Sequence, residues 1–144
     1  MLKIKRVDHI AVGVVDLDEA ARRWQEAFGF RPRDREKVES QKVEVVVLPA
    51  GDTSIELISP RGNDSLSRFL EARGPAALHH VALEVEGIEE ALAFLASLGV
   101  PLIDEAPRQG ARGHKIAFVH PKATGGVLVE LVEPRKAGGG SPAS

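Results

Sequence analysis

Val7-Asp8-His9-Ile10-Ala11-Val12-Gly13-Val14 is written a second time in this chain, as Leu78-His79-His80-Val81-Ala82-Leu83-Glu84-Val85. A pattern typical of an amphipathic helix follows each copy, and a second matching pair, residues 55–60 and 129–134, closes each half. Each half therefore opens with a strand that carries a histidine and ends with a strand that carries a glutamate. The duplication predicts two copies of one structural unit.

The order of elements inside each copy predicts the fold class. Residues 4–14 alternate as a strand, with His9, Ala11 and Gly13 on one face and Asp8 and the aliphatic side chains on the other. Asp16 is suited to begin the following helix and Gly29 to end it. We predict an α+β fold of two tandem β-α-β-β-β units that form a curved, cup-like mixed sheet around a metal site.

The repeats set the boundaries within residues 1–136, which we interpret as a single domain. The repeats span residues 4–60 and 76–134, and residues 61–75 are expected to be a helical connector. Strands are predicted at 30–38, 42–48 and 53–58, then at 78–85, 101–105, 115–119 and 127–132, and helices at 65–72 and 88–98. The Gly-rich and Ser-rich residues 137–144 are expected to be a disordered tail.

Composition excludes several classes of function. The net charge of -2 offers no basic field for nucleic acid, and no run is long and apolar enough to suggest a membrane span or a signal peptide. With no cysteine, thiol nucleophiles and Cys-ligated zinc are excluded, so histidines and carboxylates must carry any metal chemistry. We expect a cytoplasmic enzyme or binding protein.

The corresponding histidines and glutamates predict the metal site. His9 and His80 are 71 residues apart and Glu56 and Glu130 are 74 apart, so each pair occupies equivalent places in the two copies. Imidazole and carboxylate ligands suit Co(II), Mn(II), Ni(II), Zn(II) or Fe(II), and four ligands leave positions open for substrate. The alternative is that a strand histidine is simply hydrogen-bonded structure, and that Glu56 is a surface side chain.

The remaining polar residues near these positions are given lesser roles. His79 is expected on the opposite face of its strand from His80, with a structural role. His114 and His120 lie in loop or turn sequence and are not expected to bind metal. Asp8 is interpreted as a strand-edge group or as a hydrogen-bond partner of a ligand.

The sequence also resembles a known family. The paired units with histidine and glutamate at matching places resemble the vicinal oxygen chelate (glyoxalase/bleomycin resistance/dioxygenase) superfamily. Within it, residues 102–131, and above all the HPK-x-TGGVL-x-EL motif at 120–131, are similar to the methylmalonyl-CoA epimerases; the likeness spans residues 7–133. The resemblance implies a homodimeric isomerase of an acyl-CoA in propionate metabolism. It also implies His9, His80 and Glu130 as ligands of a divalent metal, first Co²⁺, otherwise Mn²⁺, Ni²⁺ or Zn²⁺, with Glu56 as the fourth.

The implied reaction assigns roles to further residues. Removal of a proton between a thioester and a carboxylate gives an enolate, and inversion requires an acid/base group on each face. Glu130 is expected to be one catalytic group. The resemblance places the other at Val45 if counted from Gln41 and at Glu44 if counted from Pro49, and Glu44 is the only carboxylate of the two. Candidates for substrate binding are Gln41, Arg108, Arg112, Lys115 and Lys122, most of them in or beside the loop 106–114. The four cations are expected to form a rim that suits the phosphates of coenzyme A, the alternative being an ordinary solvated surface.

Other functions of the same architecture are open alternatives. A glyoxalase I-type lactoylglutathione lyase would use the same His, Glu, His, Glu set, but the motif at 120–131 argues against it. An Fe(II) oxygenase is disfavoured by the absence of tyrosine and the few aromatic residues. A metal-independent protein that sequesters a small molecule would be distinguished by weak metal retention.

Overall fold

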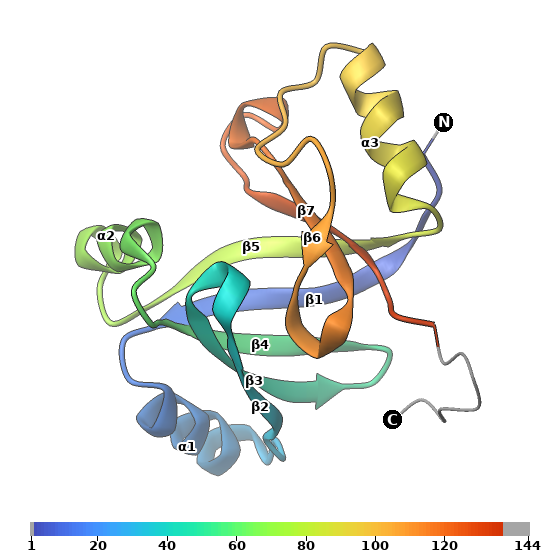
Figure 1. The fold of residues 1–144 in the computed structure, drawn as a ribbon. Coiled ribbons are helices and arrows are strands. Elements are labelled where there is room, and N and C mark those ends of the chain that lie inside the picture. Colours follow the sequence, from blue (N-terminus) through green and yellow to red (C-terminus); the bar gives the residue numbers. More distant parts are fainter. Residues whose placement is uncertain (1, 137–144) are drawn as a thin grey trace.

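The computed structural model describes residues 2–136, and the predicted disordered tail at 137–144 lies outside this part. One curled sheet has eight strands in the order β2-β3-β4-β1-β5-β8-β7-β6, and three α-helices lie against it (Figure 1). The sheet encloses a hollow lined by residues of both halves. The predicted α+β class and the curved mixed sheet are confirmed. The elements are β1 (Ile4–Val14), α1 (Leu17–Phe28), β2 (Arg33–Val38), η1 (Glu39–Gln41), β3 (Val43–Ala50), β4 (Thr53–Pro60), α2 (Asp64–Arg73), β5 (Ala76–Val85), α3 (Ile88–Ser97), β6 (Arg108–Gln109), η2 (Ala111–Gly113), β7 (Lys115–Val119), η3 (Pro121–Ala123) and β8 (Val129–Glu133).

The duplicated strands are neighbours at the centre of the sheet. β1 and β5 pair antiparallel, while β4 runs parallel to β1 and β8 runs parallel to β5. The strand order therefore reads the same outward from the β1/β5 pair in both directions, which relates the two halves by a pseudo-twofold axis between these strands. Residues at equivalent places in the two copies meet around that axis.

Helix α1 has the ends that the sequence predicts. The side chain of Asp16 accepts a hydrogen bond from the backbone N–H of Glu19, and Gly29 ends the helix in a left-handed conformation. Leu17 packs with Val12 and Val14 of β1, so the aliphatic face of β1 lies under the following helix as expected. This packing leaves the opposite face of β1 free to line the hollow.

Helix α2 packs on that opposite face at one end of the sheet. Leu66 and Leu70 are buried in a cluster with Ala11 and Ile58. A Cβ on Gly13 would come within 3.1 Å of Leu66 Cδ1, so the lack of a side chain at this position lets α2 approach β1. The helical connector thereby forms one wall of the hollow, on the side where Figure 1 shows α2 beside β5 and β1.

The second unit differs from its prediction at one strand. Residues 101–105 form only an isolated bridge, between Leu102 and Val119, and the fourth strand is the short β6 inside the predicted loop. The Asp104 carboxylate accepts the backbone N–H of Phe118, which takes the place of a ladder bond there. No helix among residues 2–136 is long and apolar enough to cross a membrane.

Candidate metal centre and substrate cavity

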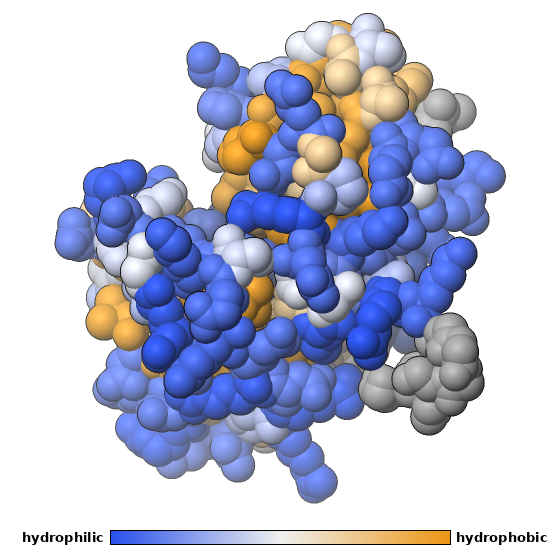
Figure 2. Space-filling model, viewed as in Figure 1, coloured by the Kyte–Doolittle hydropathy of each residue, from blue (hydrophilic) through white to orange (hydrophobic). Residues whose placement is uncertain are grey.

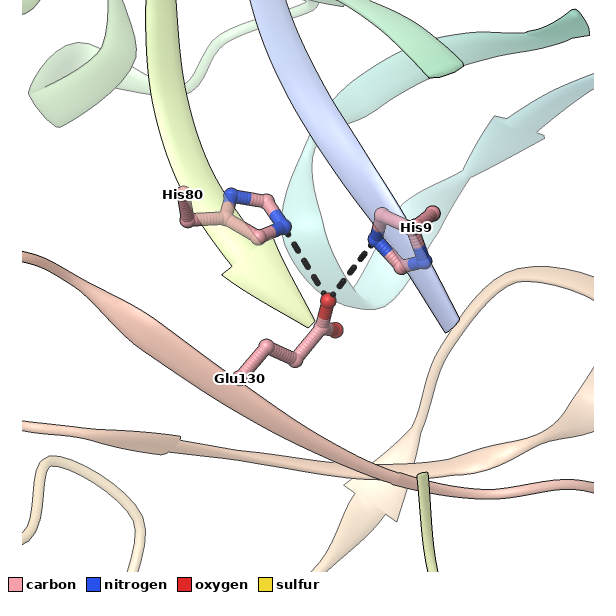
Figure 3. Close-up of side chains that lie close together, drawn as sticks. All are labelled: His9, His80 and Glu130. Carbon is pink, nitrogen blue, oxygen red and sulfur yellow. Dashed lines mark hydrogen bonds and ion pairs between the residues drawn. The ribbon is translucent and has the colours of Figure 1, made fainter. Parts of the chain in front are cut away.

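Three side chains from three strands converge inside the curled sheet (Figure 3). Glu130 Oε1 lies 3.0 Å from His80 Nε2 and 3.1 Å from His9 Nε2. All three side chains are buried, with 4 to 8% of their surface exposed. The three ligand atoms are close enough together to bind one metal ion.

Strand register accounts for this convergence. Across the β1/β5 pair, His9 is opposite Ala82 and His80 is opposite Ala11. The same two alanines are opposite the glutamates, Ala11 beside Glu56 and Ala82 beside Glu130. Both alanines are completely buried. Their small side chains leave the space above the sheet that the four longer side chains enter.

An irregularity of register precedes each histidine. Asp8 and His79 are each left without a partner where the β1/β5 register shifts by one residue, as in a β-bulge. Asp8 Oδ2 lies 2.7 Å from His9 Nδ1, and His79 Nδ1 lies 2.8 Å from His80 Nδ1. The expectation that His79 points to the opposite face from His80 was therefore wrong, because strict alternation fails at a bulge. Asp8 contacts His9, in agreement with the interpretation of Asp8 as a hydrogen-bond partner of a ligand.

The electrostatics of the centre favour a bound cation. Burial by itself lowers the pKa of His9, but hydrogen bonds to Asp8 and Glu130 and the charge of Glu56 outweigh it and raise that pKa to about 10. Burial raises the pKa of Glu130, yet its hydrogen bonds with His80 and His9 hold it well below its ordinary value. The surrounding carboxylates thus require a positive charge between them.

The donor atoms also fit a divalent metal. Two ligand atoms at right angles, each about 2.1 Å from an ion, are about 3 Å apart. The separations of Glu130 Oε1 from the two Nε2 atoms, 3.0 and 3.1 Å, agree with this spacing. Two imidazoles and one carboxylate suit a first-row transition metal, and three ligands leave open positions. His9, His80 and Glu130 can therefore hold such an ion.

Glu56 lies in the same cavity but on the other side of His9. A cavity of about 30 Å³ is lined by all four expected ligands, together with Asp8, Arg112 and His114 among others. Glu56 Oε2 lies 3.3 Å from His9 Nδ1 and accepts a hydrogen bond from Arg112 Nη2 at 2.9 Å. Potential ligand atoms of Glu56, Asp8 and His9 lie within 4.8 Å of one another. This set is separate from the one formed by His9, His80 and Glu130.

A larger cavity of about 430 Å³ adjoins the centre at His80. Its walls include the beginning of α2, where Asn63 and Ser65 lie, and Arg108 and Phe118 from the second half. Figure 2 shows the surface hollowed between α2 and the part that carries β6 and β7, with hydrophobic side chains along the latter. Gln41 lines both cavities, so the predicted substrate residues Gln41 and Arg108 lie at this hollow.

The structure places Glu44 away from both cavities. Its carboxylate binds Arg35 at 2.7 Å and Arg61 at 3.4 Å, and Arg35 holds the pKa of Glu44 below its ordinary value. Because side chains alternate along β3, it is Val45 that lines the small cavity. Glu44, which the sequence suggested as the second acid/base group, is thus not brought to the centre.

Of the other residues considered from the sequence, some line a cavity and some do not. Lys115 is exposed and pairs with Glu89 at 2.8 Å, and Lys122 is exposed in η3. Neither residue lines the small or the larger cavity. His120 accepts the backbone N–H of Lys122 and begins η3. His114, which was discounted as a ligand, does line the small cavity, where its Nδ1 accepts the backbone N–H of Arg135. The sequence signal that could have indicated this position is that His114 directly precedes the strand β7.

Comparison with known proteins agrees with this geometry. Residues 8–118 match the model of the glyoxalase/bleomycin resistance protein/dioxygenase superfamily. An uncharacterized Bacillus subtilis protein is 43% identical over 92% of this chain and 94% of its own. The mitochondrial methylmalonyl-CoA epimerase of Mus musculus is 35% identical over 90% of this chain and 73% of its own.

Solved structures give the same result. The crystal structure of methylmalonyl-CoA epimerase from Mycobacterium tuberculosis has a TM-score of 0.86 and 31% identity, over 92% of this chain and 90% of that one. A methylmalonyl-CoA epimerase in complex with methylmalonyl-CoA and NH₄⁺ has a TM-score of 0.84 and 29% identity, over 92% and 96%. The chain therefore belongs to the glyoxalase/bleomycin resistance protein/dioxygenase superfamily and, within it, to the isomerases known as methylmalonyl-CoA epimerases.

Proposed function

We propose that this protein interconverts the (R)- and (S)-epimers of methylmalonyl-CoA through an enolate. The observation that carries the proposal is the buried centre of His9, His80 and Glu130 at the end of a cavity of about 430 Å³. Relatives whose names state this activity, one of them solved with methylmalonyl-CoA, support the choice of substrate. The cavity volume suits the acyl end of such a thioester.

His9, His80 and Glu130 would hold a divalent cation, with Co²⁺ proposed first and Mn²⁺, Ni²⁺ or Zn²⁺ as alternatives. Such an ion supplies Lewis acidity that stabilises the negative charge of the enolate. Asp8 and His79, in contact with the Nδ1 atoms, would keep each imidazole oriented with Nε2 toward Glu130. The acyl group would then be fixed over the two buried alanines of the central strands.

Two carboxylates related by the pseudo-twofold axis would move the proton. Glu130 and Glu56 lie beside Ala82 and Ala11 at equivalent places in the two halves, on opposite sides of His9. Glu130 lies at the buried centre, and its carboxylate would accept the α-proton on one face of the substrate. We propose that Glu56, rather than Glu44, serves the other face.

Alanine variants of the three glutamates separate these roles. Glu56→Ala is expected to retain bound metal and to lose epimerisation by about a hundred-fold or more. Loss of metal from Glu56→Ala would instead make Glu56 the fourth ligand, as the sequence resemblance implied. Glu44→Ala is expected to retain full activity, and a large loss there would make Glu44 the second acid/base group. Glu130→Ala should lose both metal and activity.

The experiment that tests the function starts from one pure epimer of methylmalonyl-CoA. Metal-loaded protein should change its circular dichroism until the two epimers reach equilibrium, and chelator-treated protein should not. A stable dichroism signal with metal-loaded protein would contradict the proposal. Turnover of a glutathione hemithioacetal instead would favour the glyoxalase I alternative, and tight small-molecule binding without metal would favour sequestration.

The remaining properties stay predictions. A homodimer, a cytoplasmic location and a place in propionate metabolism follow from the sequence and its resemblance alone. Lys115 and Lys122 stay candidates for the CoA phosphates at the rim, because both are exposed cations. Sedimentation of the purified protein would test the dimer.

A further inference from the structure

Arg112 reaches the metal cavity from the opposite half of the molecule. It lies in η2, between β6 and β7 of the second unit, and has a left-handed backbone with φ of 56°. Its backbone N–H donates to Glu36 and its guanidinium to Glu56, both in the first unit. The loop is therefore fixed across the hollow, with the Arg112 side chain in the wall of the cavity of about 30 Å³. The sequence had suggested Arg112 for a cationic rim instead.

The guanidinium has one buried donor without an acceptor. Nη2 binds Glu56 at 2.9 Å, but Nη1 is buried and has no hydrogen-bond partner within residues 2–136. A buried donor left unpaired at an ionised group is costly, so natural structures seldom keep one without a function. Nη1 would be satisfied by an anionic acceptor that enters with a ligand.

The charges of the cavity explain why such a donor is needed. Asp8, Glu56 and Glu130 line the cavity, and Arg6 pairs with Asp8 at 3.2 Å. A divalent ion would balance the two other carboxylates, which leaves no positive charge for an anionic acyl group. The Arg112 guanidinium supplies that charge, and its forked donors match the geometry of a carboxylate.

We infer that Arg112 is a specificity-determining residue that binds the free carboxylate of the acyl group through Nη1 while Nη2 stays on Glu56. This inference rests on the proposed function and deepens it: the enzyme selects CoA thioesters of 2-carboxy acids over the corresponding simple acyl-CoA esters. The carboxylate would lie beside Glu56, the group assigned to one face of the substrate. Selection by a charged hydrogen bond of this kind is worth about ten-fold or more in affinity.

Binding of malonyl-CoA and acetyl-CoA measured by calorimetry on the Co²⁺-loaded protein tests the inference, because these esters differ only in the carboxylate. The native protein should bind malonyl-CoA at least about ten-fold more tightly than acetyl-CoA. Arg112→Met should abolish most of this preference and change the affinity for acetyl-CoA by less than about two-fold, with its metal content unchanged. Arg112→Lys, which keeps the charge without the fork, should retain part of the preference and serves if Arg112→Met does not fold.

Arg22→Met is the matched control, since Arg22 is exposed on α1 and, among the residues that the structure describes, pairs only with Glu26, at 3.1 Å. It should leave both affinities unchanged. A preference for malonyl-CoA that survives in Arg112→Met and Arg112→Lys, or that is missing from the native protein, overturns the role of Arg112 while leaving the epimerase proposal standing. Failure of the native protein to bind either ester, with no change in the dichroism of methylmalonyl-CoA, overturns both.

Discussion

Asp8 and His79 occupy the same place in the two copies of the repeat, and each contacts the Nδ1 atom of the histidine that follows it. The contacts are 2.7 Å for Asp8 with His9 and 2.8 Å for His79 with His80. A register shift at each residue turns it to the side of the following histidine. The two partners differ in charge, because burial and then the charge of His80 lower the pKa of His79 to about 4 and keep it neutral.

This relationship predicts metal affinity. Asp8→Asn and His79→Phe should each weaken Co²⁺ binding by about ten- to a hundred-fold, because an imidazole ligand loses the partner that orients it. Calorimetric titration with Co²⁺ measures the effect, and the absorption spectrum of the bound ion should shift. Glu105→Gln, a change at an exposed carboxylate, is the control. Affinities equal to that control would show that the two contacts do not support the ligands.

The raised pKa of His9 predicts how metal-free stability depends on pH. The pKa rises from 6.5 to about 10 on folding, so protonated His9 stabilises the folded state. This contribution is complete below pH 6.5 and is lost as pH rises toward 10, with an upper bound of about 5 kcal/mol. Urea unfolding of chelator-treated protein should therefore show the free energy of unfolding falling over that range.

His9→Gln supplies the comparison for the pH experiment, since it removes the titrating group. The difference in stability between native protein and variant should narrow between pH 6.5 and 10. A difference that stays constant across this range would mean that His9 keeps an ordinary pKa in the folded protein.

The close approach of α2 predicts a packing effect at Gly13. Gly13→Val should lower the free energy of unfolding by about 1 to 3 kcal/mol, because its Cβ would press on Leu66 and Leu70. Urea unfolding at neutral pH measures the loss. An unchanged midpoint would show that α2 moves away without cost, and binding in the cavity beside α2 would then be expected to change instead.

Much of this architecture could be predicted from sequence because duplication provides information that no single strand carries. The equivalence of His9 with His80 and of Glu56 with Glu130 predicted that the four side chains converge. All four line the small cavity of the structure. The ends of α1 were predictable since Asp16 and Gly29 act locally. The short β6 was not, because pairing of two residues depends on the position of β7 rather than on a local pattern.

The misses at the site have a common physical cause. The side to which Asp8 and His79 point depends on bulges, which period-two alternation does not reveal, although contact of Asp8 with a ligand was among the predictions. Arg112 was expected at a cationic rim but lines the small cavity, because its loop contacts Glu36 and Glu56 of the other half. Glu44 was suggested by counting along the chain, but the pleat of β3 turns Val45 to the cavity. Each of these depends on tertiary placement.

The reaction proposed for the centre of His9, His80 and Glu130 is proton transfer at the α-carbon from either face of the substrate. The most direct test incubates metal-loaded protein with one epimer of methylmalonyl-CoA in deuterated water and follows the α-proton by NMR. We predict loss of the α-proton signal together with formation of the opposite epimer, and neither with chelator-treated protein or Glu130→Ala. An α-proton that persists with metal-loaded native protein would show that this centre does not catalyse the proposed proton transfer.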